Sequence, residues 1–206
     1  MGQRRRVADR DERKLLQRLR RRDEAAFTEL VRRYQDRVLG LTYRMLGNRA
    51  EAEDLAQEVF ITVFKSIEGF RGDARLGTWI YRVTINHCKN RLKYLGRRGR
   101  AGQRPYAEGS HGSDAAPALS GAVAGPEASA RGREMERLVQ RAIAELPDDQ
   151  RELVVLRDIE SLSYDEIREI TGLVPGTVKS RLHRARVALQ RRVAELAQET
   201  DRGAGG

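Results

Sequence analysis

The segment from Ser163 to Arg186 constrains the fold most, because three of its features mark where helices begin and end. Ser163 is followed three residues later by Glu166, a capping box that predicts a helix N-terminus. Gly172 stands where a helix end needs left-handed backbone, and Pro175 suits the first turn of a second helix. The segment therefore predicts two short helices joined by a tight turn, a helix-turn-helix.

The second predicted helix has one apolar and one polar face. Its apolar residues recur at helical spacing: Val178, Leu182, Ala185 and Leu189. Its polar and basic residues are Thr177, Lys179, Ser180, Arg181, His183, Arg184 and Arg186. Hydroxyl and imidazole groups can reach base edges, while arginine and lysine hold phosphates. A surface helix with merely solvated charges is the alternative. The agreement of turn, cap and charge favours a helix that lies in the DNA major groove.

The balance of charge supports a nucleic-acid partner. The chain has 206 residues and a formal net charge of +10, which favours a polyanionic partner. Its one cysteine, Cys88, excludes an intramolecular disulfide. No apolar run approaches membrane-spanning length, and the first residues lack the apolar core of a signal peptide. We therefore expect a cytoplasmic protein without direct membrane insertion, which would need a partner to reach a membrane.

The pattern along the chain predicts an all-α protein of two small helical domains joined by a flexible linker. Residues 97–133 are rich in Gly, Ala, Ser and Pro and cannot bury enough apolar surface to offset their ordering entropy. The expected divisions are a basic, frayed segment 1–22 with a helical start near Glu12 to Leu19, a helical domain 23–96, the linker 97–133, a helical domain 134–197 with the helix-turn-helix, and a disordered tail 198–206.

Two helices open the N-terminal domain. The first carries an apolar stripe from Phe27 to Met45 and ends at Gly47. The second, about residues 50–67, buries Ala52, Leu55, Val59, Val63 and Ile67, and places Asp54, Gln57, Glu58, Ile61 and Lys65 on another side. An exposed isoleucine among acidic groups suits a protein-docking surface with an apolar centre and a polar rim. An ordinary solvent face with one apolar residue is the alternative.

A glycine-rich loop, residues 68–77, precedes a third helix that Thr78 is expected to cap. The buried side of that helix is predicted to hold Tyr81, Ile85, Cys88 and Leu92. Its opposite side collects Trp79, Arg82, Asn86, Lys89, Asn90 and Lys93. Interleaved aromatic, amide and basic groups are what single-stranded nucleic acid requires, because bases stack on rings and cations follow the backbone. The alternative is a core tryptophan beside a solvated run of charge.

Neither a catalytic site nor a metal site is expected. His87 adjoins Cys88, but no further cysteine or histidine cluster accompanies them. The sequence has no phosphate-binding loop, no assembled nucleophile and base, and no paired-carboxylate cleft. We therefore expect no enzyme activity, no cofactor and no metal.

Four motifs in register resemble the extracytoplasmic-function (ECF) group of the bacterial sigma-70 family of sigma factors. They are the run from Asp54 to Phe60, the run from Phe70 to Asp73, the run from Thr78 to Asn86, and the run from Gly176 to Arg186. The resemblance covers about residues 23–98 and 134–193. Pro175 directly precedes Gly176, whereas many members have a residue between the two, and the linker is long for this group.

The resemblance implies a role for each surface. Asp54, Gln57, Glu58 and Ile61 would dock on the β′ clamp helices of core RNA polymerase, and the C-terminal domain would rest on the β flap. The loop with Phe70 and Arg71 would capture a flipped base of the minus-ten element. Minus-ten reading and melting would involve Trp79, Arg82, Asn86, Lys89, Asn90 and Lys93. The minus-thirty-five duplex would be read by Thr177, Lys179, Ser180, Arg181, His183 and Arg184.

The resemblance also implies that an anti-sigma factor, often membrane-bound, holds the protein inactive. An autonomous helix-turn-helix repressor or activator remains the main alternative. It would explain the C-terminal half but would leave the faces around Asp54 and Asn86 without a purpose. A nucleic-acid-processing enzyme is a weaker alternative, because no catalytic constellation is present. The sequence does not specify the promoter, the inducing signal or the identity of the anti-sigma factor.

Overall fold

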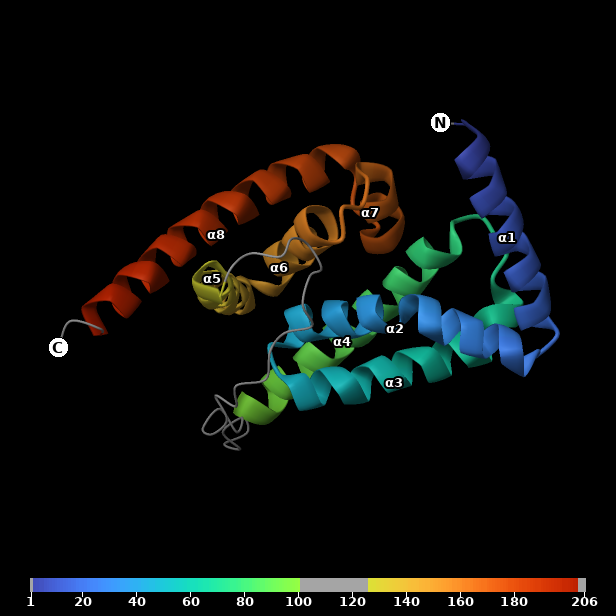
Figure 1. Ribbon diagram of the computed structural model, residues 1–206, viewed down its shortest axis with the longest axis horizontal. Helices are drawn as coiled ribbons and strands as arrows, with labels where there is room; N and C mark the ends of the chain where they lie inside the picture. The colour runs from blue at the N-terminus through green and yellow to red at the C-terminus, as the bar shows by residue number, and fades with distance from the viewer. Residues whose placement is uncertain (1, 101–125, 204–206) are drawn as a thin grey trace.

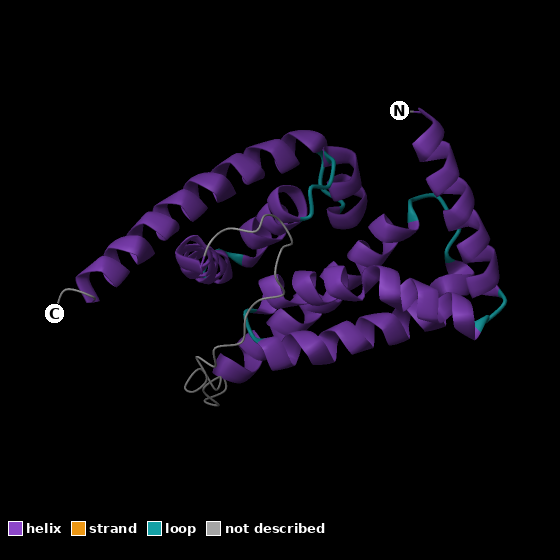
Figure 2. Cartoon of the chain, viewed as in Figure 1, coloured by secondary structure: helices purple, strands orange, loops and turns teal. Residues whose placement is uncertain are grey.

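The computed structural model describes residues 2–100 and 126–203, and every regular element in these ranges is helical (Figures 1 and 2). The all-α prediction is therefore confirmed. The elements are α1 (Gly2–Arg20), α2 (Glu24–Leu46), α3 (Arg49–Ser66), the 3-10 turn η1 (Ile67–Gly69), α4 (Leu76–Arg100), α5 (Pro126–Ala144), α6 (Asp148–Val154), the π-helical turn η2 (Val155–Ile159), α7 (Tyr164–Thr171) and α8 (Pro175–Gly203).

Short polar side chains and one glycine set the boundaries of α2 and α3. Asp23 caps α2 by accepting the backbone N–H of Ala26 at 3.0 Å. As predicted, α2 ends at Gly47, whose backbone is left-handed with φ of 70°. Asn48 then caps α3 by accepting the N–H of Glu51 at 3.0 Å. The chain thus reverses direction within two residues, and α2 and α3 lie side by side (Figure 1).

Two predicted boundaries in the N-terminal half are wrong. The basic segment is helical from Gly2 to Arg20, because Leu15 and Leu19 recur one turn apart and are buried against the bundle. Helix α4 begins at Leu76, two residues before Thr78, so Thr78 is a buried residue of the first turn rather than a cap.

Three helices also extend beyond the predicted domain ends. Helix α4 continues to Arg100 and α5 begins at Pro126, so both ends of the predicted linker are helical, and residues 101–125 lie outside the described ranges. Helix α8 continues to Gly203, past the predicted end at residue 197. Leu196 is buried, and Arg192 pairs with Glu199 at 3.3 Å, which stabilises these last turns.

The N-terminal helices have a core of their own. It contains residues of α1 to α4, including Leu19, Leu30, Val63 and Ile80, all nearly inaccessible to solvent. Helix α1 crosses the end of this bundle, at the right of Figure 1, and shields the beginning of α4. This packing fixes the position of the loop between η1 and α4.

A second core joins the N-terminal helices to the C-terminal ones. Leu41 and Met45 of α2 and Ile85 of α4 belong to the same buried cluster as Leu156 and Leu182 from the C-terminal half. Arg151 of α6 reinforces the junction. Its guanidinium donates to the carbonyl oxygens of Ala144 at 2.6 Å, Leu146 at 2.9 Å and Ile143 at 3.2 Å, and also to that of Met45 in α2. The C-terminal end of α5 and that of α2 are therefore held by one buried cation.

A buried polar group completes this junction. Glu160 accepts the hydroxyl of Tyr81 at 2.6 Å and lies 3.6 Å from the guanidinium of Arg44. The side chains of Arg44 and Glu160 are only 8% and 10% exposed, so the charge of each is balanced by the other rather than by solvent. Gly40 makes room for this pair, because a Cβ there would lie 2.6 Å from Arg44 Nη1. Burial, with the neighbouring carboxylate of Glu160, raises the pKa of Tyr81 well above its ordinary value, so Tyr81 remains a donor.

Candidate DNA-binding and polymerase-binding surfaces

The helix-turn-helix has the local geometry that its sequence predicts. The hydroxyl of Ser163 accepts the N–H of Glu166 at 3.2 Å, and the Glu166 carboxylate accepts the N–H of Ser163 at 2.9 Å, so the capping box is complete. Gly172 ends α7 with φ of 73° and donates to the carbonyl of Arg168 at 2.8 Å. Pro175 is the first residue of α8.

The first turns of α8 bury one face and expose the other. Val178, Leu182 and Ala185 are buried, as predicted, and α8 packs on α6 and α7. The predicted DNA-reading residues lie on the open side: Lys179, Ser180, His183 and Arg184 are exposed, and Thr177 and Arg181 are half-buried. The first turns of α8 therefore present a basic, hydroxyl-containing face to solvent.

The arginines of this helix differ in their surroundings. Arg181 lies 3.7 Å from the carboxylate of Asp149 in α6, and Arg186 pairs with Asp158 of η2, with Nε 3.0 Å from Oδ2. Among the described residues, Arg184 and Lys179 form no ion pair. Arg184 is therefore the arginine that can reach a phosphate or base without first leaving a carboxylate.

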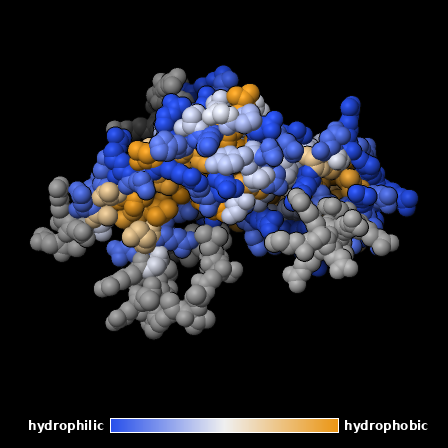
Figure 3. All heavy atoms as spheres, turned by 90° about the horizontal axis from the view of Figure 1, so that it is seen from above, coloured by the Kyte–Doolittle hydropathy of each residue, from blue (hydrophilic) through white to orange (hydrophobic). Residues whose placement is uncertain are grey.

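The predicted docking face lies on α3. Asp54, Gln57, Glu58 and Ile61 are all exposed, and 52% of Ile61 is accessible. Phe64, one turn beyond Ile61, is also exposed, at 44%. Two apolar side chains thus lie beside acidic and amide groups on one helix, which is the composition of a protein interface. By contrast, hydrophilic residues cover most of the described surface in Figure 3, where the largest apolar area lies at the left and smaller ones lie near the top and at the right.

Helix α4 presents the predicted polar face. Arg82, Asn86, Lys89, Asn90 and Lys93 are exposed along it. Lys89 is engaged by the C-terminal half, since its Nζ lies 2.9 Å from Oε1 of Glu152. Glu152 is buried at 4% exposure, and this burial raises the pKa of its carboxyl despite the opposing effect of Lys89. One cation of the face is thus held by an acidic residue of α6.

Two residues predicted on the minus-ten surface are buried instead. Trp79 is 7% exposed and Phe70 is 6% exposed, and their ring centroids lie 4.9 Å apart. Helical spacing places Trp79 in line with Asn86, but at that end of α4 the same side packs against Phe70, in the core that also holds Leu15 and Leu19 of α1. The two rings belong to the core, and the exposed loop residues are Arg71, Gly72, Asp73 and Arg75.

Sequence reasoning missed Arg91, which links the docking helix to α4. Its guanidinium lies 2.7 Å from Glu58 and also pairs with Glu51 of α3. Burial lowers the pKa of Arg91, but its hydrogen bond to Glu51 and the charge of Glu58 outweigh this effect, so the pKa is raised. His87 lies nearby, 3.0 Å from the hydroxyl of Thr62 and 3.9 Å from Glu58. The sequence signal for such a bridge was the spacing of Glu51 and Glu58, which lie seven residues apart and so share one face of α3.

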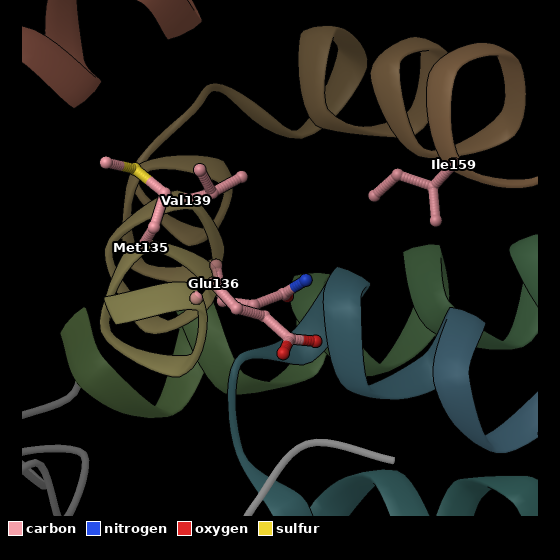
Figure 4. Close-up of a pocket in the computed structure, with 6 residues that line it drawn as sticks. Met135, Glu136, Val139 and Ile159 are labelled. Carbon is pink, nitrogen blue, oxygen red and sulfur yellow. The ribbon is translucent and has the colours of Figure 1, made fainter. Parts of the chain in front are cut away.

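Two further features of the described residues are an apolar groove and a buried cysteine. An apolar groove between α5 and η2 is lined by Met135, Val139 and Ile159, with Glu136 as its one ionisable side chain (Figure 4). Burial and nearby Glu152 raise the pKa of the Cys88 thiol to about 12. Within residues 2–100 and 126–203, no three carboxylate, imidazole or thiol side chains gather closely enough to hold a metal ion. No helix in the same ranges combines the length and apolarity needed to cross a membrane.

Two family descriptions match the two halves of the chain. Sigma-70 region 2 matches residues 30–98, which contain α3 and most of α2 and α4. Sigma-70 region 4 matches residues 136–189, which contain the helix-turn-helix. The two matches have the order that the sequence motifs predicted.

Curated relatives and solved structures agree with these matches. The chain is 38% identical over 190 residues to the RNA polymerase sigma-H factor of Pseudomonas aeruginosa, covering 90% of this chain and 95% of that protein. It is 38% identical over 182 residues to the ECF RNA polymerase sigma-E factor of Haemophilus influenzae, covering 88% of this chain and 95% of that one.

Two solved structures share the fold. One is CnrH in complex with the cytosolic domain of CnrY, with a TM-score of 0.63, 22% identity, and coverage of 89% of this chain and 97% of that one. The other is the sigma factor RpoE of Bartonella quintana in complex with the anti-sigma factor NepR, with a TM-score of 0.65, 22% identity, and coverage of 82% and 96%. The chain therefore belongs to the ECF group of the sigma-70 family and acts in promoter-specific transcription initiation with RNA polymerase.

Proposed function

We propose that this sigma factor reads its promoter in two physical forms. The exposed face of α8 reads the minus-thirty-five element as duplex, and the face of α4 with the loop 70–75 binds the minus-ten element as a melted strand. The observation that supports this best is that two separate basic faces, one on a helix-turn-helix and one rich in amides, occur in one chain. A helix fits the major groove of a duplex, whereas amide and basic groups along a helix suit an opened strand.

The docking face of α3 supplies the scaffold for these two sites. We propose that Asp54, Gln57, Glu58 and Ile61 bind the β′ clamp helices of core polymerase, and that the C-terminal helices rest on the β flap. Two modest DNA sites held on one scaffold gain effective concentration, so the pair binds far more tightly than either alone. Energy from capturing the minus-ten strand then offsets the cost of opening the duplex.

The contact between Lys89 and Glu152 bears on this mechanism. Lys89 can neutralise a DNA phosphate only after it leaves Glu152, which lies in the C-terminal half. Minus-ten binding is therefore expected to require some separation of α6 from α4. Helix α8 has no such requirement at Arg184, which is exposed and forms no ion pair with the described residues.

We further propose that an anti-sigma factor regulates the protein. The similar structure of RpoE is described as a complex with the anti-sigma factor NepR, and that likeness of fold supports the proposal. Binding to a membrane-anchored anti-sigma factor would hold this cytoplasmic chain at a membrane. Co-purification with an anti-sigma factor, and loss of transcription on its addition, would support this regulation.

Run-off transcription tests the function directly. The chain with added core polymerase should initiate at a defined position on genomic promoter fragments, and neither the chain alone nor core polymerase alone should do so. Sequencing of the transcripts would identify the promoter. Tight operator binding and repression in the absence of added polymerase would instead favour an autonomous regulator.

Asn86→Ala tests the division between the two DNA sites. The amide of Asn86 lies on the exposed face of α4, so its loss should slow strand opening more than formation of the closed complex. Gln35→Ala, which removes an exposed amide from α2, is the matched control and should change neither step. Equal losses in both steps would contradict the assignment of Asn86 to the melted strand.

A further inference from the structure

Helix α1 contacts both ends of the loop 70–75, which we call the minus-ten loop. At its first residue, the guanidinium of Arg20 donates to the carbonyl oxygen of Phe70 at 2.5 Å. At its far end, the carboxylate of Glu12 accepts the N–H of Leu76, the first residue of α4, at 2.6 Å. The two contacts join residues that are 50 and 64 positions apart in the sequence.

The geometry of α1 suits this double contact. Glu12, Leu15 and Leu19 recur at three and four residues, so they share one face of the helix. Leu15 and Leu19 are buried in the same core as Phe70 and Leu76. Glu12 and Arg20 are eight residues apart, which is about 12 Å along a helix. A rigid helix anchored by leucines can therefore fix the separation of the two ends of the loop.

A third contact fixes the chain just before the loop. Arg22, two residues after the end of α1, donates to the carbonyl of Phe64 at 2.9 Å and pairs with Glu68 of η1 at 2.7 Å. Its φ of 60° is unusual for a residue other than glycine, so the turn after α1 is itself constrained. The segment that leads into the minus-ten loop is thus held by the turn that follows α1.

The middle of the loop remains open. Arg71, Gly72, Asp73 and Arg75 are exposed, and Gly72 has φ of 83°, a left-handed conformation that glycine adopts at little cost. The side chain of Phe70 points inward against Trp79 and serves as an anchor. The loop therefore combines fixed ends with exposed residues between them, of which Arg75 also lies 3.9 Å from Glu166 of α7, and this arrangement suits the capture of a flipped base.

The contact at Leu76 also serves a helix terminus. The first N–H groups of a helix lack internal partners, and a carboxylate there is favoured by the helix dipole. Glu12 supplies that carboxylate from another helix, in the place where the sequence predicted Thr78 as the cap. The start of α4, and with it the register of Arg82 and Asn86 relative to the loop, depends on α1.

We infer that α1 is a positioning element for the minus-ten loop, and that Glu12 and Arg20 hold its ends so that the loop is formed before DNA arrives. This inference rests on the proposed role of the loop in binding the melted strand. It assigns a purpose to the N-terminal segment that its basic composition alone does not indicate. The proposed role does not depend on the net positive charge of α1, because Glu12 is acidic and Arg20 donates to a neutral carbonyl group.

Hydrogen exchange on the full chain provides the first test. Arg20→Ala and Glu12→Ala should each increase exchange at Leu76 and across the minus-ten loop by about tenfold, the change expected for loss of one charge-assisted hydrogen bond. Glu12→Gln keeps an acceptor oxygen and should retain most of the protection. Arg13→Ala and Asp11→Ala remove exposed charges of the same signs from α1 and are the matched controls. Unchanged exchange in Arg20→Ala and Glu12→Ala would overturn the inference.

Promoter opening provides the second test, with holoenzyme and the promoter fragment on which the wild-type chain initiates. Arg20→Ala and Glu12→Ala should reduce open-complex formation by about tenfold while closed-complex formation stays within about twofold. Equal losses for Arg13→Ala and Arg20→Ala would show that α1 acts through net charge, and would overturn the inference. If Arg20→Ala also increases hydrogen exchange in α2 and α3, the test uses Glu12 instead. Open-complex formation should then be lower for Glu12→Ala than for Glu12→Gln, and equal losses would overturn the inference. Failure of the wild-type chain to initiate would instead count against the proposed function.

Discussion

The helix-turn-helix and the minus-ten loop are built in opposite ways. The hydrogen bonds that cap the start and the end of α7 join residues close in sequence, Ser163 with Glu166 and Gly172 with Arg168. The minus-ten loop is held by Glu12 and Arg20, which come from a separate helix. The caps of the first site should therefore tolerate changes elsewhere in the chain, although α7 also packs on α4, whereas both ends of the second site depend on distant residues.

The two sites also differ in how available their charges are. Arg184 of α8 is exposed and forms no ion pair with the described residues, so it can meet DNA without rearrangement. Lys89 of α4 is held by Glu152, a buried residue of the C-terminal half. Each site thus has one cation beside a carboxylate of α6, Arg181 by the exposed Asp149 and Lys89 by the buried Glu152, and only the downstream carboxylate is buried. Four predictions sharpen or break this contrast.

The largest effect is expected for Arg151→Ala. This change leaves the carbonyl oxygens of Ala144, Leu146 and Met45 without their charged donor in a buried junction. We expect the free energy of unfolding to fall by about 3 kcal/mol, measured by urea denaturation. The exposed Arg137→Ala is the control. A loss under about 1 kcal/mol, typical of a surface ion pair, would show that the C-terminal helices do not depend on this junction.

Arg184→Ala should have the next largest effect. Removing a cation that contacts DNA should weaken upstream duplex binding by about 2 kcal/mol and reduce the salt dependence by about one charge. Fluorescence anisotropy of the holoenzyme on the promoter duplex, at several salt concentrations, measures both. Arg191→Ala, farther along α8 and highly exposed, serves as the control. An unchanged affinity would place Arg184 outside the interface.

A smaller effect is expected for Ser163→Ala. Loss of the capping hydroxyl should destabilise α7 by about 1 kcal/mol, measurable by denaturant titration. Asn48→Ala removes the corresponding cap of α3 and should cost about as much. Their functional effects should diverge, since Ser163→Ala should weaken upstream binding and leave strand opening intact. Equal loss of opening in both variants would remove the distinction between a locally built and a distantly supported site.

The smallest expected effect is a dependence on pH at the junction. Burial raises the pKa of Glu152 in the folded chain, so its contribution to stability is present below its ordinary value of 4.5 and is lost as pH rises through the folded value. Glu145, whose hydrogen bond from Arg192 lowers its pKa, contributes the opposite sign, with stability lost as pH falls.

Denaturation at a series of pH values separates these two carboxylates. The stability of Glu152→Gln, relative to the wild-type chain, should increase as pH rises above 4.5. The stability of Glu145→Gln, relative to the wild-type chain, should decrease as pH rises toward 4.5 and then stay level. Parallel profiles for the wild-type chain and Glu152→Gln would show that the Glu152 carboxyl does not titrate differently in the folded chain.

Features set by neighbouring residues could be predicted from the sequence. The capping box at Ser163, the left-handed Gly47 and Gly172, and the buried stripe of Val178, Leu182 and Ala185 are all confirmed. Each follows from backbone preferences or from helical periodicity, which act over a few residues. The exposure of Ile61 and Asn86 also agrees with the faces that periodicity assigned to them.

Features set by packing between distant helices could not be predicted. Periodicity placed Trp79 on the polar face of its helix, because it could not show that the loop before α4 packs Phe70 against Trp79 in the core. Thr78 looked like a cap because it is a short polar residue near a predicted helix start, whereas Glu12 from another helix accepts the N–H of Leu76. The length of α1 depends on the burial of Leu15 and Leu19 against partners far along the chain.

The amino-acid sequence by itself determined the helices, their turns, the order of the two halves and the chemistry of the exposed faces, because these depend on local conformational preferences and on residue type. Only the tertiary structure decided that Trp79 is core, that Lys89 meets Glu152, and that Glu12 and Arg20 hold the minus-ten loop. Such contacts depend on which helix faces meet when apolar surface is buried, and this packing is determined by all the helices together rather than by any local segment.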